Sequence, residues 1–356
     1  MFSDLEMTTQ IAKEKSPRDW PTLLGDNART AGQGLRPLGS PEKAVWQFRT
    51  GSAVRSAPVL HDGILYVASV NGALHAIDVA AGTSKWKFEA AGQVHSTPSL
   101  FGDAILFGCD NGTVYAVDRH LGKKLWDAAS QSEVWSSPVV RNGVVFFGSA
   151  DGKVYAMDAE KGHSRWSQEL GGRIYSTPYA AEHQVYVGCG DGKVYSLEAA
   201  SGKVVWSTPT GNGIDSSPAV TENVVLIGSE DFFVYALNAS TGEVRWKYET
   251  GLGIASSPAV SGDFVAIGSK DGLLYAFDLQ TGQLRWKTVV GEVVTASAVM
   301  ADDSVCIQAG ATFALDVASG KIRWRADLGG SIQSVPVLAG DTIYLASLNG
   351  EIYALR

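Results

Sequence analysis

The sequence predicts an all-β protein, a single eight-bladed β-propeller whose blades are four-stranded antiparallel sheets. Two observations carry this prediction. The 40-residue unit contains four short apolar runs separated by turn residues, and none of its windows has apolar positions at helical spacing. Tryptophans also recur at intervals of forty residues, followed by one more at Trp324: Trp46, Trp86, Trp126, Trp166, Trp206, Trp246 and Trp286. A fixed period of this length indicates a repeat architecture, and four strands per repeat indicate a propeller blade.

One repeat shows how the four strands arise. In residues 254–288 the strand-length apolar runs are 254–260, 264–269, 273–278 and 283–288. Asp271 and Gly272 stand between the second and third runs, and an Asp-Gly pair favours the positive φ angles of a tight hairpin. The repeat therefore reads as a simple meander of strands.

The blade count requires the two ends of the chain to meet. Blades begin near residues 54, 94, 134, 174, 214, 254, 294 and 332, and the last has only three strands before Arg356. The missing outer strand, with its Trp46, is present at 43–48. We therefore expect 43–48 to pair with 351–356, which would leave no sheet edge free. The predicted propeller is 43–356, one domain, preceded by an extension and connector over 1–42.

The repeat resembles the tryptophan-docking motif of PQQ-like β-propellers. The matching residues are Ala156, Asp158, Gly162 and Trp166, and the pattern recurs as Ala236, Asn238, Gly242 and Trp246. The resemblance covers about 44–356, and the connector resembles the lead-in of bacterial proteins of this type. It implies that each tryptophan stacks on a neighbouring blade, so that together they form a girdle round the ring. The Gly-His and Trp-Asp pairs of WD40 propellers do not recur from repeat to repeat; each occurs once, as Gly162-His163 and Trp126-Asp127.

The resemblance to this family does not by itself imply a bound cofactor. Quinoprotein dehydrogenases of this family have long insertions between blades, an adjacent Cys-Cys pair, and acidic and Asn side chains that hold Ca²⁺ beside the quinone. This sequence has neither the Cys-Cys pair nor the insertions. The propeller lipoprotein of the outer-membrane barrel-assembly machine is also similar, but its lipobox cysteine has no counterpart here. We expect no quinone and no metal.

Composition excludes several further classes of partner. The net charge is −8 and the cations are dispersed, which disfavours nucleic acid. No apolar run reaches about eighteen residues, so no membrane span is expected. Of the three cysteines, Cys109, Cys189 and Cys306, the first two share one repeat position and are interpreted as packing residues. The acidic N-terminus is unlike a signal peptide, so we expect a cytoplasmic monomer, or a periplasmic or secreted one if a signal was removed.

A functional site is expected where the repeats diverge. Two residues at the start of each innermost strand vary strongly between blades, while their neighbours hardly change. The first varied column is Arg55, His95, Trp135, Tyr175, Asp215, Ala255, Thr295 and Gln333. The second, two residues earlier, is Ala53, Gln93, Glu133, Arg173, Gly213, Gly253, Val293 and Ser331. Because innermost strands border the central channel, these columns should ring one of its mouths.

The hairpins at the same end break their own rule in two blades. Most have Asn-Gly or Asp-Gly, but blade five has Glu230-Asp231-Phe232, and blade seven has lost two residues around Gly310. Local rules fail most often at functional sites. The expected ligand-binding set follows from the columns and hairpins: Arg55, His95, Trp135, Tyr175, Asp215, Thr295, Gln333, Glu133, Arg173, Glu230, Phe232 and Lys270.

Three functions remain open at this point. The first is a binding protein that recognises a small polar or aromatic ligand, or a peptide end, in a funnel at the channel mouth. The second is an enzyme in which His95, Tyr175 and Asp215 perform acid–base chemistry. Arg55 should make His95 harder to protonate, which would keep it available as a base. The third is a protein-interaction scaffold acting through its rims.

Overall fold

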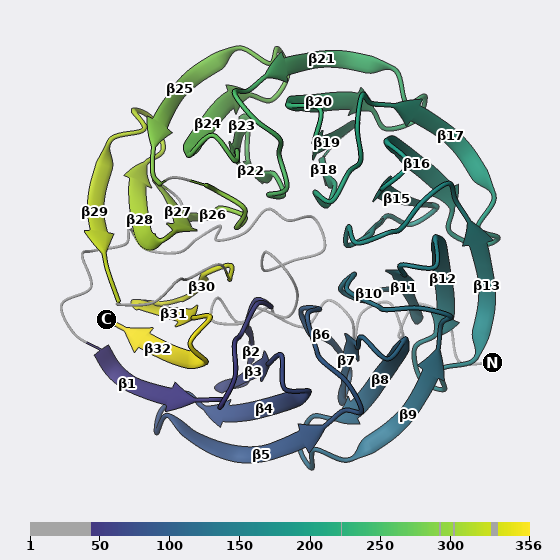
Figure 1. The fold of residues 1–356 in the computed structure, drawn as a ribbon, viewed down its shortest axis with the longest axis vertical. Helices are drawn as coiled ribbons and strands as arrows, with labels where there is room; N and C mark the ends of the chain where they lie inside the picture. The colour runs from purple at the N-terminus through teal and green to yellow at the C-terminus, as the bar shows by residue number, and fades with distance from the viewer. Residues whose placement is uncertain (1–43, 222, 292, 302, 329–333) are drawn as a thin grey trace, which may run out of the picture.

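The computed structural model describes residues 44–221, 223–291, 293–301, 303–328 and 334–356. Within these ranges the strands form eight four-stranded antiparallel sheets, arranged round a ring (Figure 1). The predicted eight-bladed propeller is confirmed. In the part of the chain so described, no helix is long and apolar enough to span a membrane. The predicted extension 1–42 and Lys43 lie outside the described residues.

Each blade runs from an innermost to an outermost strand. The innermost strands are β2 (Val59–His61), β6 (Ser99–Phe101), β10 (Val139–Arg141), β14 (Tyr179–Ala180), β18 (Ala219–Thr221), β22 (Ala259–Ser261), β26 (Val299–Ala301) and β30 (Val337–Ala339). The second strands are β3 (Ile64–Ala68), β7 (Ala104–Gly108), β11 (Val144–Gly148), β15 (Gln184–Cys189), β19 (Val224–Gly228), β23 (Phe264–Gly268), β27 (Ser304–Ala309) and β31 (Thr342–Ala346). The third strands are β4 (Ala73–Asp78), β8 (Thr113–Asp118), β12 (Lys153–Asp158), β16 (Lys193–Glu198), β20 (Phe233–Asn238), β24 (Leu273–Asp278), β28 (Ala311–Asp316) and β32 (Glu351–Leu355). The outermost strands are β5 (Thr83–Glu89), β9 (Lys124–Ala129), β13 (Ser164–Glu169), β17 (Val204–Pro209), β21 (Val244–Glu249), β25 (Leu284–Val289), β29 (Ile322–Ala326) and β1 (Ala44–Arg49).

The ring closes through its two ends, as the sequence predicts. The last blade has the order β1-β32-β31-β30, with Trp46 opposite Ala354 and Phe48 opposite Ile352. Figure 1 shows β1, at the purple end of the colour scale, beside the yellow β32. An ion pair of 3.2 Å between Arg49 and Glu351 lies at the same junction. Closure therefore covers the edge of β32 that would otherwise be free to pair with another chain.

The repeated tryptophans join neighbouring blades. Trp166 donates its indole N–H to the carbonyl of Ala199 in the next blade at 2.9 Å. A Cβ added to Gly202 would lie 2.5 Å from the same indole, so only glycine allows the ring to lie this close. The same carbonyl contact is made by six more repeat tryptophans: Trp46, Trp86, Trp126, Trp206, Trp246 and Trp286. The predicted girdle is confirmed.

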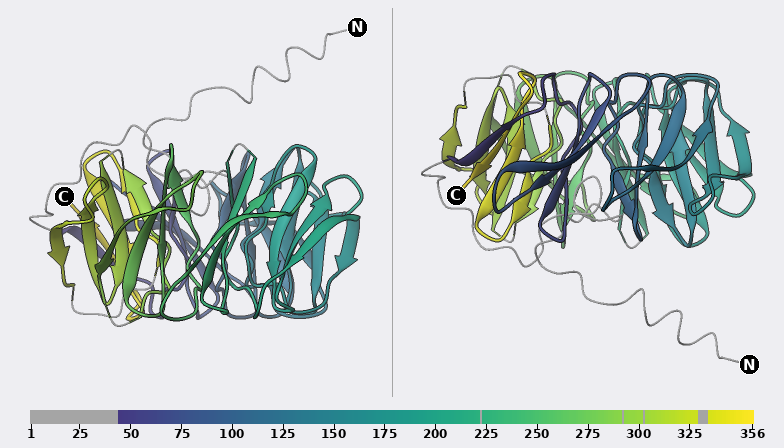
Figure 2. Two further views of the ribbon diagram at one scale, coloured as in Figure 1. Left: turned by 90° about the horizontal axis from the view of Figure 1, so that it is seen from above. Right: turned by 90° about the horizontal axis from the view of Figure 1, so that it is seen from below.

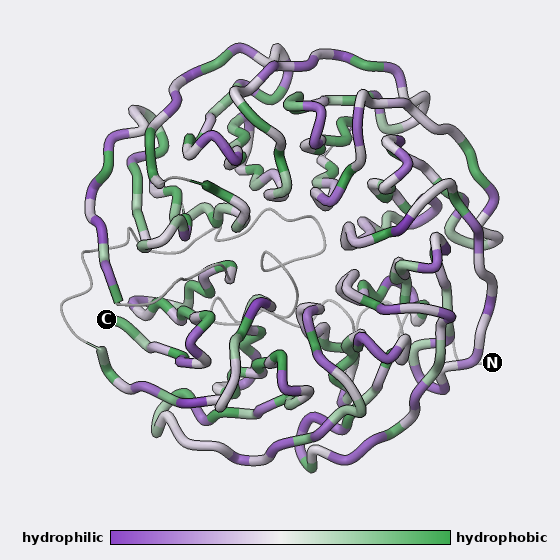
Figure 3. The backbone as a smooth tube through the Cα atoms, viewed as in Figure 1, coloured by the Kyte–Doolittle hydropathy of each residue, from purple (hydrophilic) through white to green (hydrophobic). Residues whose placement is uncertain are grey.

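The core lies between adjacent blades. The second and third strands are buried almost throughout, whereas most outermost strands alternate exposed and half-buried residues. Figure 3 shows that alternation as changes of hydropathy along the outer ring, and Figure 2 shows the molecule from the side as a short, flat cylinder. Burying one large aliphatic or aromatic side chain contributes about 1.5–3 kcal/mol. The interior is thus a rigid frame for the loops at its two ends.

Candidate functional site: the hairpin face of the ring

The varied residues are held in place by backbone bonds on both sides. In blade four, Ile174 donates its N–H to Ser149 of the previous blade's hairpin at 3.1 Å. The carbonyl of Arg173 accepts from Gly190 in the blade's own hairpin at 2.9 Å. The same two bonds are made in blades one, three, five and six, so each of these loops is fixed between two hairpins. This confirms that the hairpins and the varied columns share one end of the ring, here called the hairpin face.

A belt of side-chain hydroxyls fixes the same loops two residues further on. The N–H of Thr97 donates to the hydroxyl of Ser137 at 2.9 Å, and the N–H of Ser137 donates to the hydroxyl of Thr177 at 3.2 Å. Equivalent bonds continue to Ser217, Ser257 and Ser297, each between residues forty apart. Neighbouring blades are thus held in register beside the varied positions.

Aromatic side chains from three successive blades form a continuous series. The rings of His95 and Trp135 have centroids 4.9 Å apart, and those of Trp135 and Tyr175 are stacked at 4.6 Å. The guanidinium of Arg173 lies over the Tyr175 ring, 5.1 Å from its centroid. Trp135 nevertheless keeps 40% of its surface exposed. The structure therefore places four predicted site residues together, with one indole accessible to a ligand.

Asp110 orients this series, and sequence analysis missed it. Its carboxylate accepts a 2.6 Å hydrogen bond from the indole N–H of Trp135 and lies 3.5 Å from Nε2 of His95. His95 also contacts Gln93 at 3.2 Å. Asp110 precedes the Asn-Gly pair of its hairpin, the position that is Glu230 in blade five and Lys270 in blade six. Comparing that column across all blades would have revealed it.

Burial determines the protonation of His95. Loss of solvent lowers its pKa below the usual range; the charge of Asp110 acts against this, and the nearby charge of Arg55 acts with it. The predicted direction is therefore confirmed, but Arg55 is not the leading cause. The imidazole is kept neutral mainly because the protonated form would be poorly solvated.

The acidic side of the site is centred on Asp215. Burial raises the pKa of Asp215, the charge of Arg173 lowers it, and that of Glu230 raises it. Its closest cation is Arg173, at 3.9 Å, and its side chain is 34% exposed. Glu230 and Lys270, both predicted as ligand-binding, instead pair with one another at 2.6 Å. Asp215 therefore remains the less neutralised of the two carboxylates.

The other predicted residues join this group less closely. Arg55 is exposed on the hairpin face and acts on His95 through its charge. Glu133 is exposed and accepts a bond from Ser132, while Thr295 is exposed. Phe232 lies in the blade-five hairpin, where its φ is 79° and 41% of its surface is exposed. Gln333 lies outside the described residues. We call the connected set the mouth cluster: His95, Asp110, Trp135, Arg173, Tyr175 and Asp215.

Comparison with known proteins now places the chain. A family model described as the outer membrane protein assembly factor BamB, of the PQQ_2 repeat type, matches residues 40–108, 110–194 and 169–356. The chain belongs to this family. A search among curated proteins finds no significant match.

Solved structures that resemble the chain show the same fold in different settings. BamB from Moraxella catarrhalis has a TM-score of 0.77 at 19% identity, covering 88% of this chain and 99% of its own. The computationally designed Ika8 protein has a TM-score of 0.78 at 17% identity, covering 89% of this chain and 99% of its own. A europium-containing methanol dehydrogenase reaches 0.83 at 14% identity, covering 98% and 100%. At these identities the likeness establishes the propeller alone.

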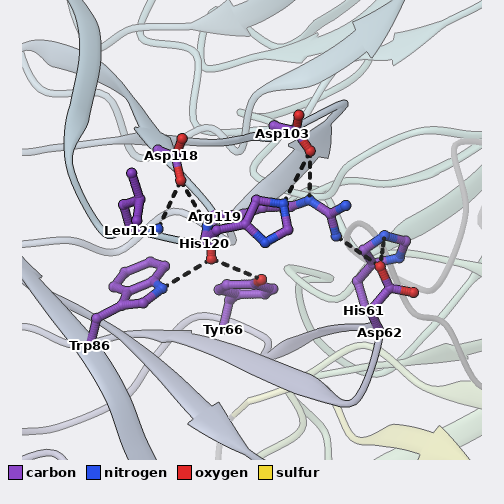
Figure 4. A network of polar contacts seen from close by, with 9 residues as sticks. All are labelled: His61, Asp62, Tyr66, Trp86, Asp103, Asp118, Arg119, His120 and Leu121. Carbon is purple, nitrogen blue, oxygen red and sulfur yellow. Dashed lines mark hydrogen bonds and ion pairs between the residues drawn. The ribbon is translucent and has the colours of Figure 1, made fainter.

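A second polar cluster, also missed by sequence analysis, joins blades one and two (Figure 4). Its residues lie at or beside the β2–β3, β6–β7 and β8–β9 loops, at the end of the ring opposite the hairpin face. Arg119 binds Asp62 of blade one at 2.9 Å and Asp103 of its own blade at 3.2 Å. His61 contacts Asp62 at 3.1 Å, and His120 contacts Asp103 at 3.2 Å. Arg119 and His120 also line a cavity of about 270 Å³ between the blades.

The repeat contained a signal for this cluster. The residue equivalent to Arg119 is apolar in the other blades that have the position: Val79, Ala159, Ala199, Ala239, Leu279 and Val317. Its carbonyl still accepts the docking indole, that of Trp86, at 2.9 Å. Because Arg119 is bound by carboxylates from both blades and its side chain is only 14% exposed, the cluster works as a brace between them.

Proposed function

We propose that this propeller is a binding protein, in which the mouth cluster recognises a small polar or aromatic ligand or the end of a peptide. One observation carries the proposal: an exposed aromatic stack lies beside polar groups that have few or no hydrogen-bond partners within the described residues. Among the described residues, the Arg55 guanidinium and the Tyr175 hydroxyl have no hydrogen-bond partner, and Asp215 has only its 3.9 Å contact with Arg173. These groups are therefore available to form hydrogen bonds or ion pairs with a ligand.

The family favours a peptide over a metabolite. The matching model is described as an assembly factor for outer membrane proteins, and an assembly factor acts on other proteins. A rigid stack of Trp and Tyr offers large contact area with few rotatable bonds, as protein-recognition surfaces do. We further propose that the propeller acts as a monomer, since each predicted binding residue comes from one ring.

A bound quinone does not fit these residues. The three cysteines are single and buried, so they provide no adjacent pair. Within the described residues, no group of three or more His, Cys, Asp or Glu side chains is arranged to hold a metal ion. We therefore propose a propeller that works without pyrroloquinoline quinone. Incubation with the quinone and Ca²⁺, then desalting, should leave no quinone absorbance; stoichiometric retention would contradict this.

Acid–base catalysis is the second candidate, because two observations favour it. His95 is kept neutral beside the Asp110 carboxylate, and the pKa of Asp215 is raised by burial. Both are properties of catalytic groups. An enzyme would lose turnover in His95→Gln while retaining its affinity for substrate, whereas a binding protein would show no turnover to lose.

A thermal-shift screen tests the binding proposal. Amino acids, nucleosides and short peptides would be screened against the wild type, a Trp135→Ala/Asp215→Asn variant, and Leu125→Ala as a control. Leu125 is 52% exposed but lies on an outermost strand. We expect at least one class of compound to raise the melting temperature of the wild type and the control but not of the double variant. Equal shifts in all three proteins would place binding elsewhere.

A further inference from the structure

The hairpin of blade five holds a phenylalanine in a conformation that suits glycine. Phe232 has a φ of 79°, and the equivalent residues of six other blades are glycines with φ between 79° and 88°. A bulky side chain at such an angle is strained, and strain of this kind persists where function requires the residue. The other two non-glycine residues with positive φ are Asp62 and Asn142. Asp and Asn adopt the left-handed region more readily than Phe does.

In other blades, the glycine at this hairpin position lies close to a carbonyl of the following loop. A Cβ added to the equivalent glycines would lie 2.7 Å from the Gly92 carbonyl in blade one and 3.0 Å from the Ser132 carbonyl in blade two. In blade five the corresponding carbonyl belongs to Leu252. Core packing does not explain why a phenylalanine is kept here, because 41% of its surface remains exposed.

Leu252 is a second apolar exception at the same point. Its equivalents in the preceding repeats are small or polar, namely Ser52, Gly92, Ser132, Gly172 and Asn212. Its backbone carbonyl accepts hydrogen bonds from the hydroxyls of Thr250 and Ser269. These bonds do not require a leucine side chain, because any residue has this carbonyl. The side chain is 46% exposed, and its two neighbours in the chain, Gly251 and Gly253, have no side chains.

Backbone bonds link these two residues to the mouth cluster. Glu230 donates its N–H to Gly213, in the loop that carries Asp215, at 3.0 Å. Two residues along the hairpin, the carbonyl of Phe232 accepts from the N–H of Thr250 at 2.8 Å, which brings in the Leu252 loop. The loops that carry Asp215, Phe232 and Leu252 are therefore connected in that order across blades five and six.

We propose that Phe232 and Leu252 form an apolar subsite on the hairpin face, which takes an aliphatic or aromatic side chain of an extended peptide whose basic group lies against Asp215. The inference rests on the proposed function and names its ligand class. Charge complementarity selects a basic group, since Lys270 neutralises Glu230 while Asp215 lacks a hydrogen bond. An extended ligand is required because the aromatic stack belongs to blades two to four and the apolar pair to blades five and six.

The repeat itself supplies the variants. Phe232→Gly restores the residue of the other hairpins, and Leu252→Ser restores the residue of two earlier loops. Because relief of strain offsets the loss of partial packing, Phe232→Gly should melt at the wild-type temperature or above. Phe147→Ala, at a fully buried position, should melt well below it. If Phe232→Gly unfolded like Phe147→Ala, the phenylalanine would be a core residue and the subsite would be wrong.

Binding is tested with an array of free-amino octapeptides on a Gly-Ser background. One Lys and one Phe occupy every pair of positions, and matched peptides replace Lys by Gln or Phe by Ser. We expect some Lys-Phe peptides to bind the wild type and to weaken about tenfold in Phe232→Gly and in Leu252→Ser. The matched peptides lacking Phe should bind the wild type and both variants equally.

The outcomes separate the subsite from the proposed function. Peptide binding that depends on Asp215 and Trp135 but not on Phe232 or Leu252 would overturn the subsite and leave the proposed function standing. Peptide binding that depends on none of these residues, or no binding by any peptide of the array, would overturn the subsite. Only when the thermal-shift screen is also negative would the proposed function fail with it.

Discussion

Trp135 and Tyr175 are stacked with ring centroids 4.6 Å apart and planes 21° apart, although forty residues separate them in the chain. They come from adjacent blades, so their separation is set by the ring and not by local sequence. Asp110 holds the indole through a 2.6 Å hydrogen bond. The stack is thus pre-organised, so ordering these side chains on ligand binding would cost the protein little conformational entropy.

Trp135→Ala should separate binding from stability. Aromatic pairs contribute about 0.5–1.5 kcal/mol beyond their burial, and 40% of this tryptophan is already exposed. We expect a modest fall in the free energy of unfolding by urea denaturation, together with loss of ligand binding by calorimetry. A loss of stability typical of a core aromatic, about 3–5 kcal/mol, would show that the residue serves packing instead.

Asp215→Asn should stabilise the protein near neutral pH. Burial raises the pKa of Asp215, so its ionised form is disfavoured in the fold, and the wild type loses stability as the pH rises through the unfolded-state pKa of about 3.8. The amide cannot ionise. We expect a gain below about 1 kcal/mol at pH 7, because the side chain is one-third exposed and screened, and no gain below pH of about 3.5. Denaturation curves at both pH values measure this, and a wild type more stable at pH 7 would contradict it.

His75→Tyr should remove a sensitivity to acid. His75 is 5% exposed with its Nε2 unpartnered, and burial lowers its pKa to about 4. The unfolded chain binds a proton below pH of about 6.5, whereas the fold does not until about pH 4, so stability falls as the pH drops between these values. The equivalent residue is Tyr in six of the other blades, and Tyr115 accepts a bond from Asn111 that Asn71 could reproduce here.

The measurement for His75 is a melting curve at pH 7 and at pH 4.5. The variant should gain more at the lower pH, by on the order of 2 kcal/mol. Tyr115→Phe serves as a control for the loss of one hydroxyl without a titrating group. Equal gains at the two pH values would mean that His75 is not the titrating residue.

Removal of residues 1–49 should open the ring. The deletion takes away β1, with Trp46 and its bond to Val79, and exposes the edge of β32. We expect a lower melting temperature and concentration-dependent association in light scattering. A synthetic peptide of residues 43–49 should bind the truncated protein and reverse both changes. An unchanged melting temperature with a monodisperse truncated protein would show that closure by β1 is dispensable.

Sequence reasoning could reach the fold because its determinants repeat. Trp166 contacts Gly202, and Trp46 makes the equivalent contact with Gly82 in another blade. Because the pattern recurs, each copy strengthens the assignment of the others. The site was reached in part, since divergence within a column marks His95, Trp135, Tyr175 and Asp215. Asp110 was missed because only Glu230 and Lys270 were selected from its column, and the column was not compared across all blades. The Arg119 brace joins residues 57 positions apart in neighbouring blades, a pairing that depends on how the blades pack.

Hydrogen–deuterium exchange with and without a bound peptide tests the central claim most directly. The peptide would be the octapeptide that most raises the melting temperature. If the mouth cluster is the binding site, protection should appear in the loops 92–97, 132–137, 172–177 and 212–217 and should be absent in Trp135→Ala. Protection confined to the outermost strands, or to the loops around Asp62 and Arg119, would contradict the account.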